Sequence, residues 1–263
     1  MFAEHPETPR NAGVVALLAV VLACACVPQP PSDEVPPSRI TSSAGARPET
    51  FDEKVYQRAS AEGQPIYRVD PTGSIVVVEV RRAGSLARLG HDHVVASHDV
   101  QGYVAPIMRR ADLYLRLDQL VVDESALRKE AGFDTNPSPD AIAGTRRNML
   151  ERTLEVERYP FASIGVRIAE ASSADPRRDG DPAPLRSQMD VDVTIALHGT
   201  ARTFRIPLQR QISEAMIEVT GQIALKQSDF GIAPLSILGG SIQVQDQLAL
   251  RFHIEARRVP GFG

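Results

Sequence analysis

The sequence has no tryptophan, and aromatic residues make up only 5% of its 263 positions. It has two cysteines, Cys24 and Cys26, both in the first tenth of the chain. The rest of the chain therefore has no disulfide framework and no thiol chemistry. The formal charge is −4 and no stripe of lysine or arginine is present, which argues against a nucleic-acid partner. With 43% hydrophobic residues, the chain can still build an apolar core.

The usual signatures of catalysis are also missing from the sequence. It contains no Gly-x-Ser-x-Gly elbow, no P-loop, no Gly-x-Gly-x-x-Gly after a strand and no His-Glu-x-x-His. We therefore expect a protein that is not an enzyme. A hydrolase or isomerase that uses His91, His93 and Asp99 is the catalytic alternative.

The N-terminal segment has the pattern of an export signal. Residues 11–26 carry no charge, follow Arg10 and end in small residues, which is typical of a secretory signal rather than a membrane-spanning helix. The letters VLA before Cys24 resemble a bacterial lipobox, and Cys26 follows a similar ACA. We predict export to the periplasm and a lipid anchor on Cys24 or Cys26. The alternative is a cleaved signal with incidental cysteines, which would give a secreted protein.

A proline-rich stretch follows this signal. Five prolines lie between residues 28 and 37, and serine, threonine, glycine and alanine come after them. This composition predicts an extended and then flexible tether. The expected plan is a signal over 1–26, a tether over 27–64, a folded domain over 65–258 and a short tail over 259–263. Residues 51–64 have weak helical character.

The folded domain is dominated by alternation of apolar and polar residues. In residues 187–197 and 248–257 every second residue is apolar, which predicts strands buried on one side. About nine strands are expected, over residues 67–70, 74–82, 93–104, 111–122, 161–170, 187–197, 201–212, 216–226 and 248–257. Only residues 139–154 have clear helical spacing, with Asp140 as the expected cap. Residues 172–185 read as a long polar hairpin loop. The pattern favours an all-β antiparallel sandwich or closed barrel.

Five segments, in the same order along the chain, resemble the YceI-like family. They are YRVDPTGSIVVVEVRR at 67–82, GHDHVVASHDVQGYV at 90–104, MLERTLEVERYPFASI at 149–164, VTIALHGTARTFRIPL at 193–208 and LKQSDFGI at 225–232. The resemblance implies a single lipocalin-like antiparallel β-barrel of about eight to nine strands with one short helix. It also implies export to the periplasm and, as in some members, an isoprenoid lipid held inside the barrel.

Apolar residues expected to face the barrel interior are the candidate ligand lining. They are Leu113, Leu115, Leu117, Met189, Val191, Val193, Ile195, Leu248, Leu250, Phe252 and Ile254, with Met149 and Leu150 capping from the helix. An eight-stranded barrel has room for side chains or for one slim ligand, so these residues either surround a lipid or simply fill the core. Phe252 is the bulky side chain expected to block the interior if the barrel is filled.

The run of histidines and aspartates over residues 90–99 is the candidate metal site. On a regular strand, His91 and His93 face the same side and could share one metal ion. His98 would face the other side, and Asp99 would lie roughly 20 Å further along. Two ligands fall short of the four of a structural zinc site unless His198 or His253 join from neighbouring strands. The alternatives are a turn in which His91 and Asp92 satisfy loop backbone groups, and a polar contact to a ligand.

The remaining polar candidates have simpler interpretations. His198 precedes a Gly-Thr hairpin turn, and His253 points outward from its strand. Ser228 and Asp229 predict a turn held by a side-chain-to-backbone hydrogen bond, while Asp190 and Asp192 read as solubilising.

Three functions remain open at this point. The first is a membrane-tethered binding protein for an isoprenoid or similar lipid, with no cofactor. The others are a periplasmic metal-binding module and a structural or stress-related envelope component. A homodimer is compatible with each of them.

Overall fold

The computed structural model describes residues 47–168 and 187–261. The predicted signal, both cysteines, most of the predicted tether and the loop 172–185 lie outside these ranges. Within them, no helix is long and apolar enough to cross a membrane.

Eight antiparallel strands close into a β-barrel, as the alternation and the family resemblance predicted. The ring order is β1-β5-β6-β8-β9-β10-β11-β14, and pairing of β1 with β14 completes it. The strands are β1 (Tyr67–Val69), β5 (Val100–Ala105), β6 (Arg110–Arg116), β8 (Phe161–Arg167), β9 (Ser187–Leu197), β10 (Thr200–Ile212), β11 (Met216–Lys226) and β14 (Gln247–Arg258). Because alternate residues of a strand face opposite sides, each strand gives one row of side chains to the interior.

Three of these strands are continued by a second segment beyond an interruption. The continuing segments are β2 (Ile75–Val80), β4 (His93–Ser97) and β7 (Val121–Val122). β2 also pairs with β14, β4 pairs with β2, and β7 pairs with β4. The prediction of a single strand over residues 93–104 is therefore wrong, because the strand is interrupted at His98 and Asp99. A second interruption lies between β1 and β2, where Asp70 caps a short 3₁₀ turn, Pro71–Gly73.

More helical segments are found among the described residues than the one expected. α2 (Ser125–Glu130) follows β7, and α3 (Pro139–Asn148) continues into a π-helical turn, η4 (Met149–Thr153). The cap of α3 is Ser138, whose side chain accepts a hydrogen bond from the Ala141 N–H, and not Asp140 as expected. Proline at the first position of α3 explains why the cap lies two residues earlier.

A further helix, α1 (Glu53–Ala61), lies in the stretch expected to be tether. Its Tyr56 and Ala59 are buried against Ile66, Tyr103 and Ala105. Tyr103 and Ala105 alternate with inward residues on β5, so α1 covers the outer wall of the barrel. The folded unit therefore includes residues before position 65.

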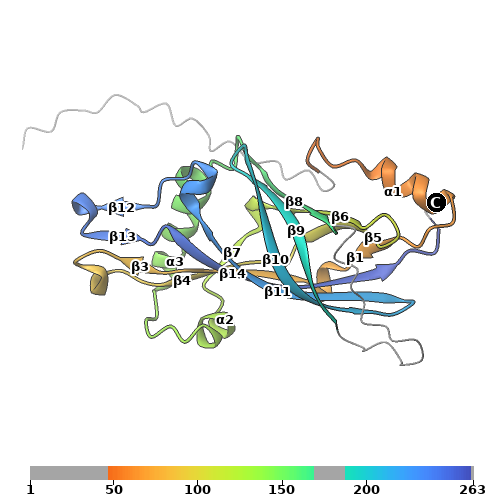
Figure 1. Ribbon diagram of the computed structural model, residues 1–263. Helices are drawn as coiled ribbons and strands as arrows, with labels where there is room; N and C mark the ends of the chain where they lie inside the picture. The colour runs from red at the N-terminus through yellow and green to blue at the C-terminus, as the bar shows by residue number, and fades with distance from the viewer. Residues whose placement is uncertain (1–46, 169–186, 262–263) are drawn as a thin grey trace, which may run out of the picture. The chain divides into compact units, whose positions relative to one another are not determined.

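The two ends of the barrel carry different elements (Figure 1). Beyond one end, β3 (Arg82–Ala83), β12 (Ser236–Ile237) and β13 (Ile242–Val244) form a small sheet. α3 and η4 lie at this same end, which we call the helix end. At the opposite end α1 lies beside the C-terminal segment, where the Val259 N–H donates to the Ile66 carbonyl. Because Arg109, Arg110 and Arg210 are found there, we call it the arginine end.

Candidate functional site

A cavity of about 570 Å³ lies inside the barrel and is almost entirely apolar. This volume falls within the range of roughly 300–1,000 Å³ that is typical of ligand sites. Twelve of the thirteen expected lining residues are on its wall: Leu113, Leu115, Leu117, Met149, Met189, Val191, Val193, Ile195, Leu248, Leu250, Phe252 and Ile254. The barrel interior is thus not completely filled by its own side chains.

Leu150 is the exception, and it does not line the cavity. It is buried against Leu117, Leu120 and Val156 instead. Neighbouring helical residues point in directions about 100° apart, so Met149 and Leu150 do not face the same space. Met149 closes the cavity from η4 together with Thr153, which lies four residues further along.

The cavity is long rather than round. Along β14 its wall runs from Leu248 to Ile254, and the six residue-to-residue steps between them span roughly 20 Å of strand. It also reaches Gln243 beyond the helix end and Ile212 at the arginine end. A slender chain therefore fits this space better than a compact ligand.

Phe252 does not close the cavity, because its ring lies against the wall beside a glycine. Gly221 is paired directly with Phe252 across β11 and β14. A Cβ on Gly221 would lie 2.6 Å from the Cζ of Phe252, so the ring occupies the space that a side chain at position 221 would take. This stacking over a strand glycine keeps the aromatic ring on the wall.

Several wall residues were not singled out from the sequence. They lie at alternate positions of β2, β10 and β11, namely Val76, Val78, Val80, Ile206, Leu208, Val219, Ile223 and Leu225. The same period of two could have identified them in β10 and β11. In β2 the signal is weaker, because Ile75 and Val77 on the opposite parity are apolar as well.

At the helix end, His93 brings a polar side chain to the cavity wall. It belongs to the inward row of β4 together with Val95 and Ser97. Its Nδ1 lies 2.6 Å from Oδ2 of Asp123, a residue directly after β7. The Asp123 side chain is fully buried, whereas that of His93 is 14% exposed.

Asp123 is the centre of a buried charged network. Its Oδ1 accepts hydrogen bonds from the Val94 N–H at 3.0 Å and from Nη1 of Arg128 at 2.6 Å. Burial would raise the pKa of Asp123, but the hydrogen bonds from His93, Val94 and Arg128 outweigh it and hold that pKa below its usual range. Asp123 also has a positive φ of 60°, a conformation in which Asp and Asn are enriched among non-glycine residues.

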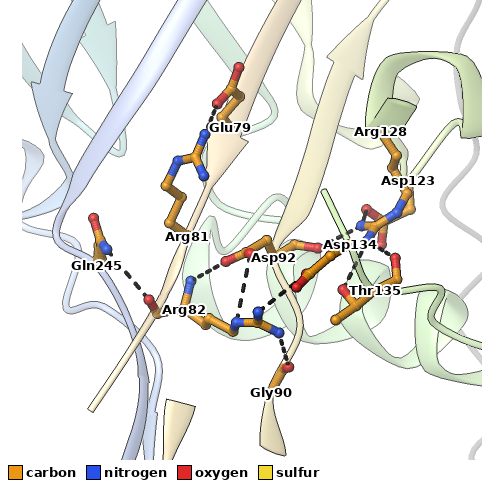
Figure 2. A network of polar contacts seen from close by, with 10 residues as sticks. All are labelled: Glu79, Arg81, Arg82, Gly90, Asp92, Asp123, Arg128, Asp134, Thr135 and Gln245. Atoms are coloured by element: carbon orange, nitrogen blue, oxygen red, sulfur yellow. Dashed lines mark hydrogen bonds and ion pairs between the residues drawn. The ribbon is translucent and has the colours of Figure 1, made fainter. Parts of the chain in front are cut away.

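The arginine of this network joins α2 to the loop that follows it. Arg128 is 7% exposed and donates from Nη1 to the Asp92 carbonyl and from Nη2 to the Thr135 carbonyl and hydroxyl (Figure 2). Sequence reasoning missed both Asp123 and Arg128. Nothing local relates residues 93 and 123, which meet only because β4 pairs with β7.

A second charged pair at the helix end, Arg82 and Asp92, holds the segment that carries His91 against β3. Oδ1 of Asp92 accepts the Arg82 N–H at 2.8 Å, and the guanidinium of Arg82 reaches the Gly90 carbonyl and Asp134 (Figure 2). Asp92 thus satisfies a backbone group, but that group belongs to β3 and not to a turn over residues 90–92. Arg82 lines the cavity, but its donors are engaged.

The histidines are spread over separate parts of the barrel. The ring centroids of His91 and His93 are 6.2 Å apart, and His98 contacts Glu124 at 2.9 Å. His198 lies beside Tyr159, and His253 lies between Glu218 and Glu255 on the outer side of β14. Over residues 47–168 and 187–261, no three His, Cys, Asp or Glu side chains gather as a metal site would require.

The expected polar turns are present with different partners. His198 and Gly199 form the turn from β9 to β10 with positive φ values of 52° and 74°. Ser228 lies in a 3₁₀ turn, Gln227–Phe230, whose backbone and hydroxyl donate to Asp246 and not to Asp229. Asp190 alternates outward, with Arg205 at 4.0 Å.

The arginine end of the cavity is positively charged. Arg109, Arg110 and Arg210 all border the cavity there. Arg210 donates from Nε to the Ser187 hydroxyl at 3.0 Å, and Arg110 donates from Nε to Asp112 at 2.5 Å.

Asp112 faces outward under α1 and collects donors from three elements. Its Oδ2 accepts the Tyr56 hydroxyl at 2.7 Å as well as Arg110, and its Oδ1 accepts Arg167 at 3.0 Å. Burial would raise the pKa of Asp112, but these hydrogen bonds and the Arg167 charge lower it overall. Asp112 therefore stays ionised and fixes α1 to the barrel.

Comparison with known proteins supports the same architecture. A model of the YceI-like domain matches residues 67–256. A polyisoprenoid-binding domain from Saccharophagus degradans, implicated in plant cell wall breakdown, is 16% identical with a TM-score of 0.52, over 73% of this chain and 98% of its own. BcnA from Burkholderia cenocepacia is 16% identical, with a TM-score of 0.45 over 71% of this chain and 98% of its own. At 16% identity, the likeness to the Saccharophagus degradans domain concerns the fold alone. No curated protein matches the chain.

Proposed function

The chain belongs to the YceI-like family, and from that premise we propose that it binds an isoprenoid or a similar long apolar lipid inside its barrel. The role is binding and not catalysis. The observation that carries the proposal is the elongated apolar cavity of about 570 Å³. Transfer of hydrocarbon from water into such a space is worth about 0.8 kcal/mol per CH₂ group, so a chain of several isoprene units gains affinity without precise polar contacts.

One solved structure adds support. The Saccharophagus degradans domain is described as polyisoprenoid-binding and shares the fold with this chain. The low identity means that the ligand is carried over as a proposal. The cavity of this chain is the independent reason for it.

Native mass spectrometry of the full chain, purified without chelator, tests the proposal. We expect an adduct of lipid mass that is lost on denaturation. Val193→Glu places a carboxylate on the inner wall and should abolish the adduct, while Gln209→Glu places one on the outer face of the adjacent strand and should retain it. A protein without any adduct, or equal adducts in both variants, would contradict lipid binding in the cavity.

Gly221→Val separates an occupied cavity from a merely loose core. The new side chain would overlap the Phe252 ring and push it into the interior. We expect less bound lipid, and recovery in the double variant Gly221→Val/Phe252→Ala. If the first substitution leaves the lipid content unchanged, the ligand lies elsewhere.

We further propose that the protein is exported to the periplasm and tethered through Cys24. The support is the uncharged segment 11–26 and the proline-rich residues that follow it. Labelling of the expressed protein with a radioactive fatty acid should give a signal that Cys24→Ser removes and Cys26→Ser retains. The reverse result would move the anchor to Cys26, and no label in any form would mean a secreted protein.

A further inference from the structure

The cavity wall contains one histidine whose proton position is determined by its neighbours. Asp123 is held ionised and can only accept hydrogen bonds. Nδ1 of His93, 2.6 Å from Oδ2 of Asp123, must therefore carry a proton and donate it. In the neutral imidazole this leaves Nε2 as a hydrogen-bond acceptor.

This acceptor is available to a ligand in the cavity. His93 belongs to the inward row of β4, is 14% exposed and borders the cavity, with Val80 and Val95 beside it on the wall. In the described part of the chain, Nε2 of His93 has no hydrogen-bond partner. A polar atom on an apolar wall loses free energy unless a ligand group or water pairs with it.

Other polar side chains also border the cavity, among them His91, Ser97 and Asn148, but in the described part of the chain none of these is an imidazole whose proton position a buried carboxylate fixes. Arg82 only donates, and its donors are directed at Gly90 and Asp134. The Gln227 amide donates to the Gln245 carbonyl. His93 is thus the side chain here whose free atom has a defined hydrogen-bonding role.

We propose that Nε2 of His93 accepts a hydrogen bond from a hydroxyl headgroup and so selects lipids that end in an alcohol, or in a hydroquinone, over those that end in a ketone or an ether. This inference rests on the proposed lipid-binding function and deepens it. The His93–Asp123–Arg128 network supplies the selectivity, and the headgroup lies at the helix end of the barrel.

A competition between two probes of equal chain length tests the inference. An equimolar mixture of a C20 prenyl alcohol and the matching prenyl methyl ketone is added to the full-length protein at about pH 8. The two adducts are counted by native mass spectrometry. We expect the alcohol to be favoured about fivefold to tenfold, the value of one net hydrogen bond.

Two variants identify the atom responsible. His93→Phe should bring the ratio to about one, whereas His253→Phe on the outer side of β14 should leave the preference intact. Asp123→Asn makes a stronger prediction. Because Arg128 and the Val94 N–H both donate to Oδ1, the Asn carbonyl must take that place, and its NH₂ must face Nδ1 of His93.

In Asp123→Asn the imidazole proton would therefore move to Nε2, and the acceptor would become a donor. The ketone should then bind more tightly, and the ratio of alcohol adduct to ketone adduct should fall to about one or below. Asn tolerates the positive φ of this position, and circular dichroism reports whether the variant folds. If it does not fold, the two histidine variants still decide.

The outcomes separate this inference from the function on which it rests. If neither probe binds to the wild-type protein, lipid binding itself fails. If both bind with a ratio of one, or if His93→Phe keeps the alcohol preference, the cavity holds lipid but His93 does not read the headgroup. An alcohol preference abolished by Arg210→Gln instead would place the headgroup at the arginine end and overturn the inference.

Discussion

The two ends of the cavity differ in how deeply their charged side chains are buried. At the helix end, Asp123 and Arg128 are almost fully buried and bind one another and the backbone of two separate segments, residues 92–94 and Thr135. At the arginine end, Asp112 gathers its partners on the outside of the barrel, and the side chain of Arg167 there is 50% exposed. A buried network that is fully satisfied fixes one geometry, whereas exposed pairs contribute little to stability. The helix end is thus held in one geometry by buried charged contacts, whereas the arginine end relies on more exposed ones.

The largest expected effect comes from removing the arginine of the buried network. Arg128→Met leaves the buried Asp123 carboxylate without its cationic partner, and we expect the free energy of unfolding to fall by about 3–5 kcal/mol. Arg210→Met at the other end keeps the stem on the wall and should cost about 0.5 kcal/mol or less. Urea unfolding of both variants measures the difference. Equal losses would mean that the two ends do not differ as described.

A smaller effect should separate the two aspartates by their response to salt and acid. Asp112→Asn and Asp123→Asn each remove charged hydrogen bonds, at a cost of about 1–3 kcal/mol near neutral pH. Salt screens the exposed Arg167–Asp112 pair more than the buried pair. We therefore expect the loss in Asp112→Asn to shrink in about 1 M salt, whereas the loss in Asp123→Asn should persist.

The pH dependence of both variants has a defined sign. The folded pKa of each aspartate is lowered, so its charged form stabilises the fold above the unfolded pKa of about 3.9. This contribution is lost as the pH falls through the folded pKa. Urea titrations between about pH 6 and pH 2 should show each variant approaching the wild type in acid, and a gap that widens in acid would refute the assignment.

The wall of the cavity could be predicted from the sequence because strand geometry is local. Period-two alternation in β9 and β14 is enough to place Val193 and Leu250 inside, whatever the rest of the chain does. Leu150 was expected on the wall but does not line the cavity, because in the helical turn η4 it points in a different direction from Met149. The closed ring itself followed from the family resemblance more than from the alternation, which suits a sandwich equally well.

The polar network could not be predicted because its members meet only through tertiary contacts. His93 and Asp123 lie thirty residues apart. They meet because β4 pairs with β7, and the sequence shows no local sign of that pairing. Asp123 reads locally as a residue before a helix, and its positive φ has no signature in the sequence. The burial of α1 is hidden in the same way, since Tyr56 and Ala59 alone give a weak amphipathic pattern.

The smallest expected effect concerns the fastening of α1 at the arginine end. Tyr56→Phe removes the hydrogen bond to Asp112 but keeps the buried ring, and we expect a loss of about 1 kcal/mol near neutral pH. Burial and the hydrogen bond to Asp112 raise the pKa of Tyr56 above its usual value.

A raised pKa means that the protonated hydroxyl stabilises the fold below the unfolded value of about 10, and that this stability is lost as the pH rises toward the folded pKa. The gap between Tyr56→Phe and the wild type should therefore narrow in urea titrations above about pH 10. Tyr159→Phe, which replaces a tyrosine at the opposite end of the barrel and beside His198, serves as the matched control. A gap that stays constant at high pH would contradict the assignment, because it would mean that the hydrogen bond from the Tyr56 hydroxyl to Asp112 does not fix α1 to the barrel.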